Sequence, residues 1–360
     1  MYDFFIVGHG LAGAILARTL RLRGHRVMVI DQPKANSASN VAAGLMNPVA
    51  GKRFAKSWQA DLFLPAAHTF YSHLEVALGE RFFFPSPIVK LFSTPEEQNN
   101  WMAKSADPGW EGLVETPLPG QLPDSDAVVQ QEYGGIIVRQ GGHVEVRRML
   151  EALQQDLKRQ EGLLEGHFDL ARLEIEGTFV RYETITASHL IFCEGFQAST
   201  NPYFGWLPFS LNKGEVLDVR VDNFKPQCIY NKGVYVLPLM SGEGLRVGAT
   251  YDWRQVDEKC TDVAQAELSQ KLGQVIWHPF EVKAQYAGIR PAVRDRRPLI
   301  GTHPDIPVLH IFNGMGSKGV MMAPYLARHF AEVLEGERQL LNEVNICRYF
   351  PLYYENRKPQ

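Results

Sequence analysis

The sequence predicts an α/β fold in which a domain built on a mainly parallel sheet is interrupted by a second domain of antiparallel strands. Three observations support this prediction. A strand–helix–strand unit opens the chain, a strand, glycine turn and helix follow one another near its end, and strands separated by turn glycines lie between. Because parallel-type units lie at both ends, one discontinuous domain with an insertion fits better than two consecutive domains.

The opening unit carries a dinucleotide-binding pattern. FFIV predicts a buried strand, AILARTLRLRG a helix, and RVMVID a second strand that ends on Asp31. Gly8, Gly10 and Gly13 form G-x-G-x-x-G at the strand–helix junction. They allow a tight turn, close approach of a phosphate, and close helix–strand packing.

Asp31 lies about 20 residues beyond these glycines, where an acidic side chain accepts ribose hydroxyls. Strand, helix, second strand and acid together predict a Rossmann-like site for FAD or NAD rather than NADP. The alternative is a glycine-rich turn that binds no ligand.

A second glycine pattern, formed by Gly314, Gly316 and Gly319, follows the apolar segment VLHIF and precedes a helix over residues 320–334. No second strand with a terminal acid follows it, so we do not expect a second dinucleotide. We expect the turn at 313–319 to direct a helix N-terminus at an anionic group, such as the pyrimidine edge of a reduced flavin. A turn needed only for packing is the alternative.

The remaining pattern divides the chain. Helices are expected after Pro65 up to Leu78 and over 146–160, and a buried strand is expected to end on Gly195. GEVLDVRV, GVYVLPL and LRVGATYDW alternate like antiparallel strands. We therefore predict a nucleotide-binding domain at 1–80, 145–210 and 285–360. The substrate-binding domain is predicted at 81–144 and 211–284.

Composition excludes several classes of protein. The 45% hydrophobic residues predict a folded core, and a net charge of −3 argues against a polybasic nucleic-acid coat. Four separated cysteines without a CxxC pair support neither a zinc ribbon nor a disulfide framework, and we expect no metal. Since no apolar run could span a bilayer and no secretory signal is visible, we expect a cytoplasmic enzyme without a membrane span.

Several segments together resemble the D-amino-acid oxidase superfamily of FAD-dependent amine oxidases: SNVAAGLMNP, GEVLDV, YVLPL, LRVGATYDW, AGIRPAVRDRRPLIG and NGMGSKGVMMAPYLA. That superfamily includes glycine oxidase, sarcosine oxidase and the oxidoreductase domain of a bifunctional enzyme that modifies the tRNA wobble uridine. The resemblance implies a glutathione-reductase-type FAD domain. It also implies non-covalent FAD, because RPAVRDRRPLIG contains no cysteine.

The resemblance implies two sets of site residues. The cofactor set is Gly8, Gly10, Gly13 and Asp31 at the ADP half, Leu170 at the adenine, Gly195 near the cofactor, Ala43, Gly44 and Leu45 beside the flavin ring, and Gly314, Gly316, Ser317, Lys318 and Gly319 at its pyrimidine edge. The catalytic set is Arg290, Tyr235 and Tyr251.

Arg290 matches an arginine that binds the substrate carboxylate, for which a guanidinium fork is suited. Its alternative role is an interdomain ion pair, and a tyrosine such as Tyr235 is otherwise core. Lys52, Arg53 and Lys56 follow the flavin-adjacent loop and form either a basic entrance for an acidic substrate or a solvated loop.

The implied reaction is oxidation of a C–N bond of an amino acid or secondary amine. Hydride passes from the substrate α-carbon to flavin N5, and water hydrolyses the imine. The substrate is expected to be a small, carboxylate-bearing molecule, and the electron acceptor is oxygen or an unidentified compound.

Two alternatives stay open. GSKG, at 316–319, is similar to the GSRG of the tRNA-modifying domain, which suggests removal of a carboxymethyl-type group from a modified wobble uridine. A non-catalytic nucleotide-binding redox module is the third hypothesis. The sequence leaves the oligomeric state open.

Overall fold

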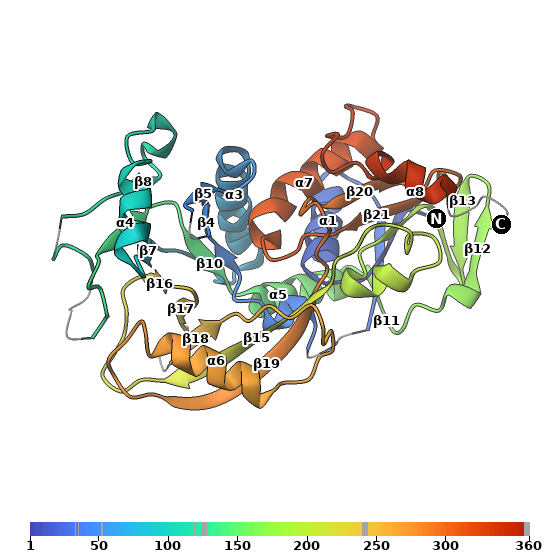
Figure 1. Ribbon diagram of the computed structural model, residues 1–360. Coiled ribbons are helices and arrows are strands. Elements are labelled where there is room, and N and C mark those ends of the chain that lie inside the picture. Colours follow the sequence, from blue (N-terminus) through green and yellow to red (C-terminus); the bar gives the residue numbers. More distant parts are fainter. Residues whose placement is uncertain are drawn as a thin grey trace.

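The computed structural model describes residues 1–32, 34, 36–51, 53–118, 120–123, 128–239 and 244–355. Within them, two eight-stranded sheets are joined by smaller sheets of three and two strands, which confirms the predicted mixed α/β class. Figure 1 shows α1, α3 and α7 gathered at the top and α6 at the bottom. The helices are α1 (Leu11–Leu22), α2 (Ala38–Val41), α3 (Ala60–Leu78), α4 (Pro95–Met102), α5 (Val146–Arg159), α6 (Asp262–Leu272), α7 (Gly319–Leu334) and α8 (Phe350–Glu355).

The first large sheet supplies the nucleotide-binding framework. Its strands are β1 (Tyr2–Val7), β2 (Val27–Asp31), β11 (Leu163–Glu165), β12 (Leu173–Glu176), β13 (Phe179–Tyr182), β14 (Ile185–Phe192), β20 (Leu299–Thr302) and β21 (Leu309–Asn313). The strands β11, β2, β1, β14 and β21 run parallel in that order. Since β21 pairs with β14, the end of the sequence completes a sheet that its beginning starts.

The opening strand is buried on both faces. Phe4 and Ile6 belong to the core cluster that contains α1 and α7, whereas Phe5 and Val7 belong to a second cluster on the other face. This explains why the segment is a continuous apolar run without polar alternation, as in parallel sheets covered by helices or loops on both sides.

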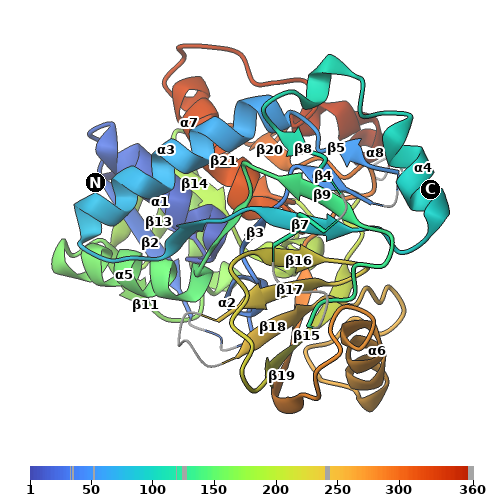
Figure 2. The ribbon, with the colours of Figure 1, turned by 90° about the vertical axis from the view of Figure 1, so that its left-hand side faces the viewer.

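The second large sheet is mostly antiparallel, as the alternating pattern predicts. Its order is β19-β15-β18-β17-β16-β7-β9-β8, and only β16 and β7 pair in parallel. Figure 2 shows β7, β16, β17 and β18 side by side. The bounds are β7 (Ile88–Leu91), β8 (Val114–Glu115), β9 (Gly135–Val138), β15 (Asn212–Arg220), β16 (Ile229–Asn231), β17 (Tyr235–Pro238), β18 (Leu245–Gly248) and β19 (Glu281–Arg290).

Two small sheets connect the large ones. One contains β3 (Leu45–Met46), β10 (Gly142–Val144) and β6 (Phe83–Pro85), and the other pairs β4 (Val49–Ala50) with β5 (Ala55–Lys56). The domain division at residues 80, 144, 210 and 284 stays a prediction. β19 is one continuous strand that runs through the last of these positions.

Two elements differ from the sequence expectation. Helix α3 begins at Ala60, so Pro65 lies inside it rather than before it. Phe63 and Leu64 are buried in the core, which favours helix ahead of the proline. Strand β14 ends at Phe192, and Gly195, with φ 59°, opens a 3-10 helix that runs to Thr200. The positive φ takes Gly195 out of the extended conformation that a strand requires.

Candidate active site

A cavity of about 730 Å³ is lined by residues of both large sheets. The predicted site residues that line it are Gly8, Gly10, Asp31, Ala43, Gly44, Leu45, Gly195, Tyr235, Tyr251, Arg290, Gly316, Ser317, Lys318 and Gly319. The predicted residues that do not line it are Gly13, Leu170 and Gly314. The cavity therefore brings together residues as far apart in the sequence as Gly8 and Gly319.

The first glycine turn is shaped by sterics. Gly8 has φ 102°, and a Cβ there would lie 2.6 Å from the Cys193 carbonyl oxygen. A Cβ on Gly13 would lie 1.9 Å from the Gly8 carbonyl oxygen. Gly13 thus lets α1 approach β1, as expected, although it does not itself face the cavity. The turn directs the N-terminus of α1 at the cavity, where free N–H groups suit a pyrophosphate.

Asp31 ends β2 beside this turn. Its carboxylate accepts a 2.8 Å hydrogen bond from the His9 backbone N–H. Burial raises the pKa of Asp31, opposed by that hydrogen bond. Burial also lowers the pKa of His9 to about 4, so its ring is neutral. The buried His9 Nε2 has no hydrogen-bond partner among the described residues, which is an orphaned polar atom at the turn.

Leu170 does not line the cavity, and its contact with an adenine stays a prediction. It begins a 3-10 helix and packs half-buried against the second core cluster. Gly166, His167 and Phe168 line the cavity in its place. The loop before the helix, rather than the helix itself, therefore reaches the nucleotide end.

The segment 43–45 passes closely under β10. Gly44 has φ 63°, its carbonyl accepts a 3.0 Å hydrogen bond from the Val144 N–H, and a Cβ there would lie 1.8 Å from the Val144 carbonyl oxygen. Only glycine fits such a position without moving the backbone. The neighbouring backbone of Ala43 and Leu45 is consequently held against the cavity.

The second glycine turn meets the first from the opposite end of the chain. Gly319 begins α7, and a Cβ there would lie 2.7 Å from the side chain of Leu11, which begins α1. Asn313 Nδ2 donates a 2.9 Å hydrogen bond to the Gly195 carbonyl oxygen. Gly314, at φ 75°, is buried, and a Cβ there would lie 2.8 Å from Val293. Two helix N-termini thus converge on one cavity.

Lys318 precedes α7 and brings a cation to this turn. Its ammonium group donates to the Ser57 hydroxyl. Burial lowers the pKa of Lys318, and the nearby guanidinium groups of Arg296 and Arg297 lower it further. No carboxylate pairs with Lys318 among the residues that the structure describes. This end of the cavity therefore favours an anionic group.

Arg290 ends β19 at the other part of the cavity. Its Nη1 donates to Asn212 Oδ1 at 2.8 Å and to the Thr250 carbonyl oxygen at 3.2 Å. Its guanidinium carbon lies 4.4 Å from the centre of the Tyr251 ring. Within the described part of the chain no acidic side chain pairs with Arg290. The guanidinium of Arg290 is therefore held in place by hydrogen bonds and can bind a carboxylate.

Two glycines that the sequence analysis missed make room for these side chains. A Cβ on Gly214 would lie 2.0 Å from Arg290 Nη2, and one on Gly248 would lie 2.3 Å from the Tyr235 hydroxyl. Both glycines lie within strands, where a missing side chain signals close approach of another group. Burial raises the pKa of Tyr235, so its hydroxyl stays protonated.

Two of the basic residues after the flavin-adjacent loop lie away from the cavity. Lys56 pairs with Asp61 at 2.6 Å, and the Arg53 carbonyl accepts a hydrogen bond from Lys104. Neither Arg53 nor Lys56 lines the cavity, so the cavity lining lends no support to a basic entrance at these two residues. Lys52 lies outside the described residues.

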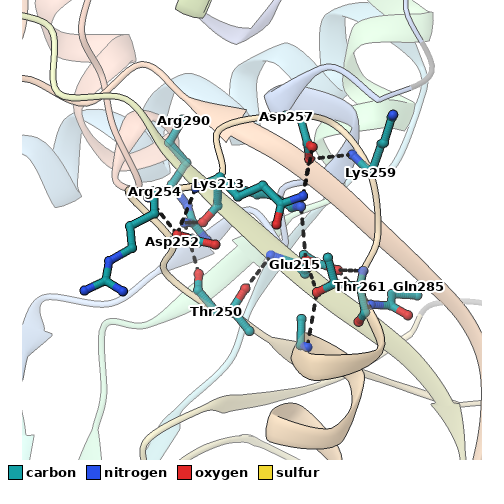
Figure 3. A network of polar contacts seen from close by, with 12 residues as sticks. Lys213, Glu215, Thr250, Asp252, Arg254, Asp257, Lys259, Thr261, Gln285 and Arg290 are labelled. Atoms are coloured by element: carbon teal, nitrogen blue, oxygen red, sulfur yellow. Dashed lines mark hydrogen bonds and ion pairs between the residues drawn. The ribbon is translucent and has the colours of Figure 1, made fainter.

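A buried polar network supports the substrate end and was not foreseen. Lys213, on β15, is only 1% exposed and reaches Asp257 at 2.8 Å and Glu215 at 3.4 Å. Glu215 also accepts hydrogen bonds from the Thr261 hydroxyl and the Gln285 amide (Figure 3). The hydrogen bond from Lys213 lowers the pKa of Asp257 to about 2. Lys213 and Glu215 are two positions apart on β15 and therefore lie on the same face of the strand. This spacing of opposite charges is the sequence pattern that could have indicated the network.

Glu194 is a second unforeseen group. It lines the cavity immediately before Gly195, and its carboxylate accepts a 2.8 Å hydrogen bond from Asn201. Burial raises the pKa of Glu194 to about 7, opposed by that hydrogen bond. Its backbone approaches the first glycine turn, since a Cβ on Gly8 would lie 3.6 Å from Glu194 Cα.

Over the described ranges no helix has the length and apolarity needed to cross a membrane. The same residues contain no group of three or more His, Cys, Asp or Glu side chains arranged to hold a metal ion.

Solved structures share the fold at low sequence identity. Glycine oxidase from Geobacillus kaustophilus superposes with a TM-score of 0.76 at 21% identity, covering 95% of this chain and 96% of that one. Iminodiacetate oxidase from Chelativorans sp. BNC1 gives 0.75 at 20% identity, covering 96% and 98%.

Curated relatives cover most of the chain. MnmC, a bifunctional tRNA 5-methylaminomethyl-2-thiouridine biosynthesis protein from Shewanella amazonensis, is 25% identical over 94% of this chain and 57% of its own length. Glycine oxidase from Pseudomonas aeruginosa is 24% identical over 94% of this chain and 96% of its own length. The chain spans about half the length of the first two curated relatives, MnmC and the bifunctional ThiO/ThiG of Nostoc.

The family model "DAO: FAD dependent oxidoreductase" matches residues 3–333. The residues present fit FAD, because two glycine turns direct helix N-termini at one cavity with an acid at the end of β2. In these turns Gly8, Gly13, Gly314 and Gly319 have no room for a Cβ. The predicted cofactor, FAD, and the predicted class of FAD-dependent oxidoreductase are thus confirmed. The chain belongs to the DAO family of FAD-dependent oxidoreductases.

Proposed function

We propose that this protein oxidises a C–N bond of a small amino acid or secondary amine that carries a carboxylate. The observation that supports the proposal most directly is Arg290. It lies in the cavity that holds both glycine turns, is fixed by Asn212, and has no acidic partner among the described residues. A substrate carboxylate is the group that its guanidinium is suited to bind.

FAD, when bound, supplies a two-electron acceptor for the C–H bond next to nitrogen. The chain's own residues bind and orient the substrate. Arg290 anchors the carboxylate, and the protonated Tyr235 hydroxyl donates a hydrogen bond from β17. The Tyr251 ring lies against Arg290 and limits the directions that a bound acid can take. With the substrate so fixed, the amine needs only to be neutral, and no strong protein base is required.

The cofactor is proposed to be non-covalent and the protein cytoplasmic, with oxygen or another compound as the electron acceptor. Acid precipitation tests the first point: free FAD should appear in the supernatant, and flavin that stays with the pellet would indicate a covalent bond.

The proposal is tested by anaerobic bleaching of the bound flavin with glycine, sarcosine and other amino acids. Replacing Arg290 with Ala removes a charge-assisted pair. The amine concentration for half-maximal reduction should rise roughly 10- to 100-fold while flavin is retained. Arg294→Ala, an exposed arginine nearby, is the matched control. Unchanged reduction by Arg290→Ala would remove this residue from the substrate site.

The similarity to MnmC over 94% of the chain supports a second candidate. The protein would then oxidatively remove a carboxymethyl-type group from a modified wobble uridine in tRNA. Arg290 would bind the same carboxylate in this case. Bleaching by tRNA that carries the modification, and by none of the free amines, would favour this candidate over the first.

A further inference from the structure

Glu258 is an acidic side chain at the active-site cavity that has no partner among the described residues. It is half-buried and lines the cavity from the loop between β18 and α6. Its Oε1 atom is buried and takes part in no hydrogen bond within the described part of the chain. A buried carboxylate oxygen without a partner costs free energy, which a bound cation recovers. Glu258 is therefore a candidate contact for a ligand.

The comparison with the other acidic side chains at the cavity strengthens this assignment. Glu258 belongs to the same loop as Tyr251, whose ring lies 4.4 Å from the Arg290 guanidinium. Among the described residues, three further acidic side chains line the cavity, and each has a partner within the chain: the His9 N–H for Asp31, Arg147 for Glu151 and Asn201 for Glu194. The contrast indicates that Glu258 serves a ligand and not the fold.

The backbone at Glu258 is fixed by the residue before it. Asp257 Oδ1 accepts hydrogen bonds from Lys213 Nζ at 2.8 Å and from the Lys259 backbone N–H at 3.1 Å (Figure 3). An Asp side chain that binds the N–H two residues further on forms an Asx turn, and Glu258 is the central residue of this one. The Glu258 carboxylate is thus presented by an anchored turn.

The nearby buried cations are engaged elsewhere. Lys213 is shared between Asp257, at 2.8 Å, and Glu215, at 3.4 Å, so its single charge already faces two carboxylates. The Arg290 guanidinium donates to neutral oxygens. Neither residue pairs with Glu258 in the described part of the chain. A cation on a ligand in the cavity would supply the missing positive charge.

The reacting nitrogen of the substrate is not the group that Glu258 suits. Oxidation requires the neutral amine, whereas a nearby carboxylate stabilises the protonated form. A second cation elsewhere in the same substrate carries no such conflict. Arg290 and Glu258 would then bind groups of opposite charge on one ligand.

We propose that Glu258 forms a subsite for a second cationic group, an ammonium or guanidinium, carried on the amine substituent of the substrate. Arg290 binds the carboxylate of that substrate, so the inference rests on the proposed function. A charge-assisted hydrogen bond at a partly buried carboxylate strengthens binding roughly 10- to 100-fold.

The reaction balances for such a substrate. The C–H bond of the carboxymethyl carbon breaks and its electron pair and hydrogen pass to the cofactor, while the nitrogen loses its proton to water and a C=N bond forms. Addition of water then breaks the C–N bond and releases glyoxylate and a diamine. The second cation takes no part in these steps, so Glu258 changes binding more than rate.

The test uses the holoprotein under anaerobic conditions with three pairs of N-substituted glycines. The N-(2-aminoethyl), N-(3-aminopropyl) and N-(4-aminobutyl) compounds carry a second ammonium, which a methyl group replaces in the N-propyl, N-butyl and N-pentyl compounds. In the pair whose length matches the separation of Arg290 and Glu258, the charged member should reach half-maximal flavin reduction at a roughly 10- to 100-fold lower concentration. Glu258→Gln keeps the size of the side chain and should abolish this preference while flavin is retained.

Glu281→Gln is the matched control, because Glu281 is an exposed carboxylate on β19 that does not line the cavity. It should behave as the unmodified protein does. Equal use of the charged and the neutral member at all three lengths, or a preference that survives in Glu258→Gln, would overturn the subsite. A larger effect of Glu258→Gln on sarcosine than on the charged compounds would place Glu258 at the reacting amine and overturn it as well.

A second measurement separates this inference from the proposed function. 6-Aminohexanoate has the length of N-(3-aminopropyl)glycine without an amine beside the carboxylate, heptanoate replaces its ammonium with a methyl group, and binding of either perturbs the absorption spectrum of bound flavin. Tighter binding of 6-aminohexanoate, lost in Glu258→Gln, would support the subsite even where no amine bleaches the flavin. Bleaching by amines with no preference for the charged compounds would leave the proposed function standing and reject the subsite.

Discussion

Arg290 and the glycines around the cavity differ in how they could be found. The requirement for Gly8 and Gly13 is local, because the turn and helix that need them adjoin them in sequence. Arg290 was indicated by family resemblance, since nothing in its own segment distinguishes it from an exposed arginine. Gly214, which makes room for it, is 76 positions away and was missed. A glycine that makes room for a side chain far away in the sequence cannot be recognised from the residues next to it.

Glu194 gives a residue-scale prediction about pH. Burial raises its pKa from 4.5 to about 7 in the folded protein. The unfolded chain therefore loses this proton at lower pH than the folded one. Stability should fall as the pH rises from about 4.5 through 7, by up to about 3 kcal/mol. A bound pyrophosphate adds negative charge nearby and acts in the same direction.

Urea unfolding of the holoprotein at pH 5 and pH 8 measures this effect. Glu194→Gln should be closer to the wild-type stability at pH 5 and more stable than wild type at pH 8. Glu111→Gln, at an exposed position, serves as the control and should show no such crossover. An equal pH dependence in wild type and Glu194→Gln would show that Glu194 ionises normally.

At the scale of elements, β15 does more than extend a sheet. Through Lys213 and Glu215 it holds the loop between β18 and α6, which carries Tyr251 and Trp253. The strand was predicted from its apolar alternation. The network was not, because its partners Asp257, Thr261 and Gln285 are brought in by the fold from other elements.

Removing Lys213 should be strongly destabilising. Lys213→Ala leaves the Glu215 carboxylate buried without its cation, and we expect a loss of about 3–5 kcal/mol in the free energy of unfolding. Lys271→Ala removes the same type of residue from an i,i+4 pair with Glu267 at the surface of α6 and should cost less than about 1 kcal/mol. Denaturant unfolding of both variants checks this, and similar losses would contradict a structural role for the network.

The whole molecule joins the two ends of the sequence at one cofactor site. The sequence predicted this arrangement because both glycine patterns need the same ligand, and the pairing of β21 with β14 agrees with it. The nucleotide end was predicted less well. The loop at 166–168 lines the cavity through tertiary packing and carries no motif, so the sequence analysis did not name it, whereas Leu170 lies in the 3-10 helix that follows.

Removing FAD should destabilise both glycine turns, the one near the start of the sequence and the one near its end. A ligand that binds only the folded state stabilises it by about 2.7 kcal/mol at a concentration 100 times its Kd. Hydrogen exchange of the apoprotein should therefore show faster exchange in the turn at 8–13 and in the turn at 313–319, with α4 as an internal control away from the cavity. Loosening of the first turn alone would contradict a shared ligand.

The hydrogen bond from Asn313 to the Gly195 carbonyl joins two parts of the site that are synthesised at different times. The first glycine turn leaves the ribosome early, whereas the residues that close the cavity are translated some 300 codons later. At ordinary elongation rates this interval lasts roughly 15–60 s. The nascent chain thus carries half a binding site throughout its synthesis. The complete site for FAD therefore forms only after the second glycine turn has been translated.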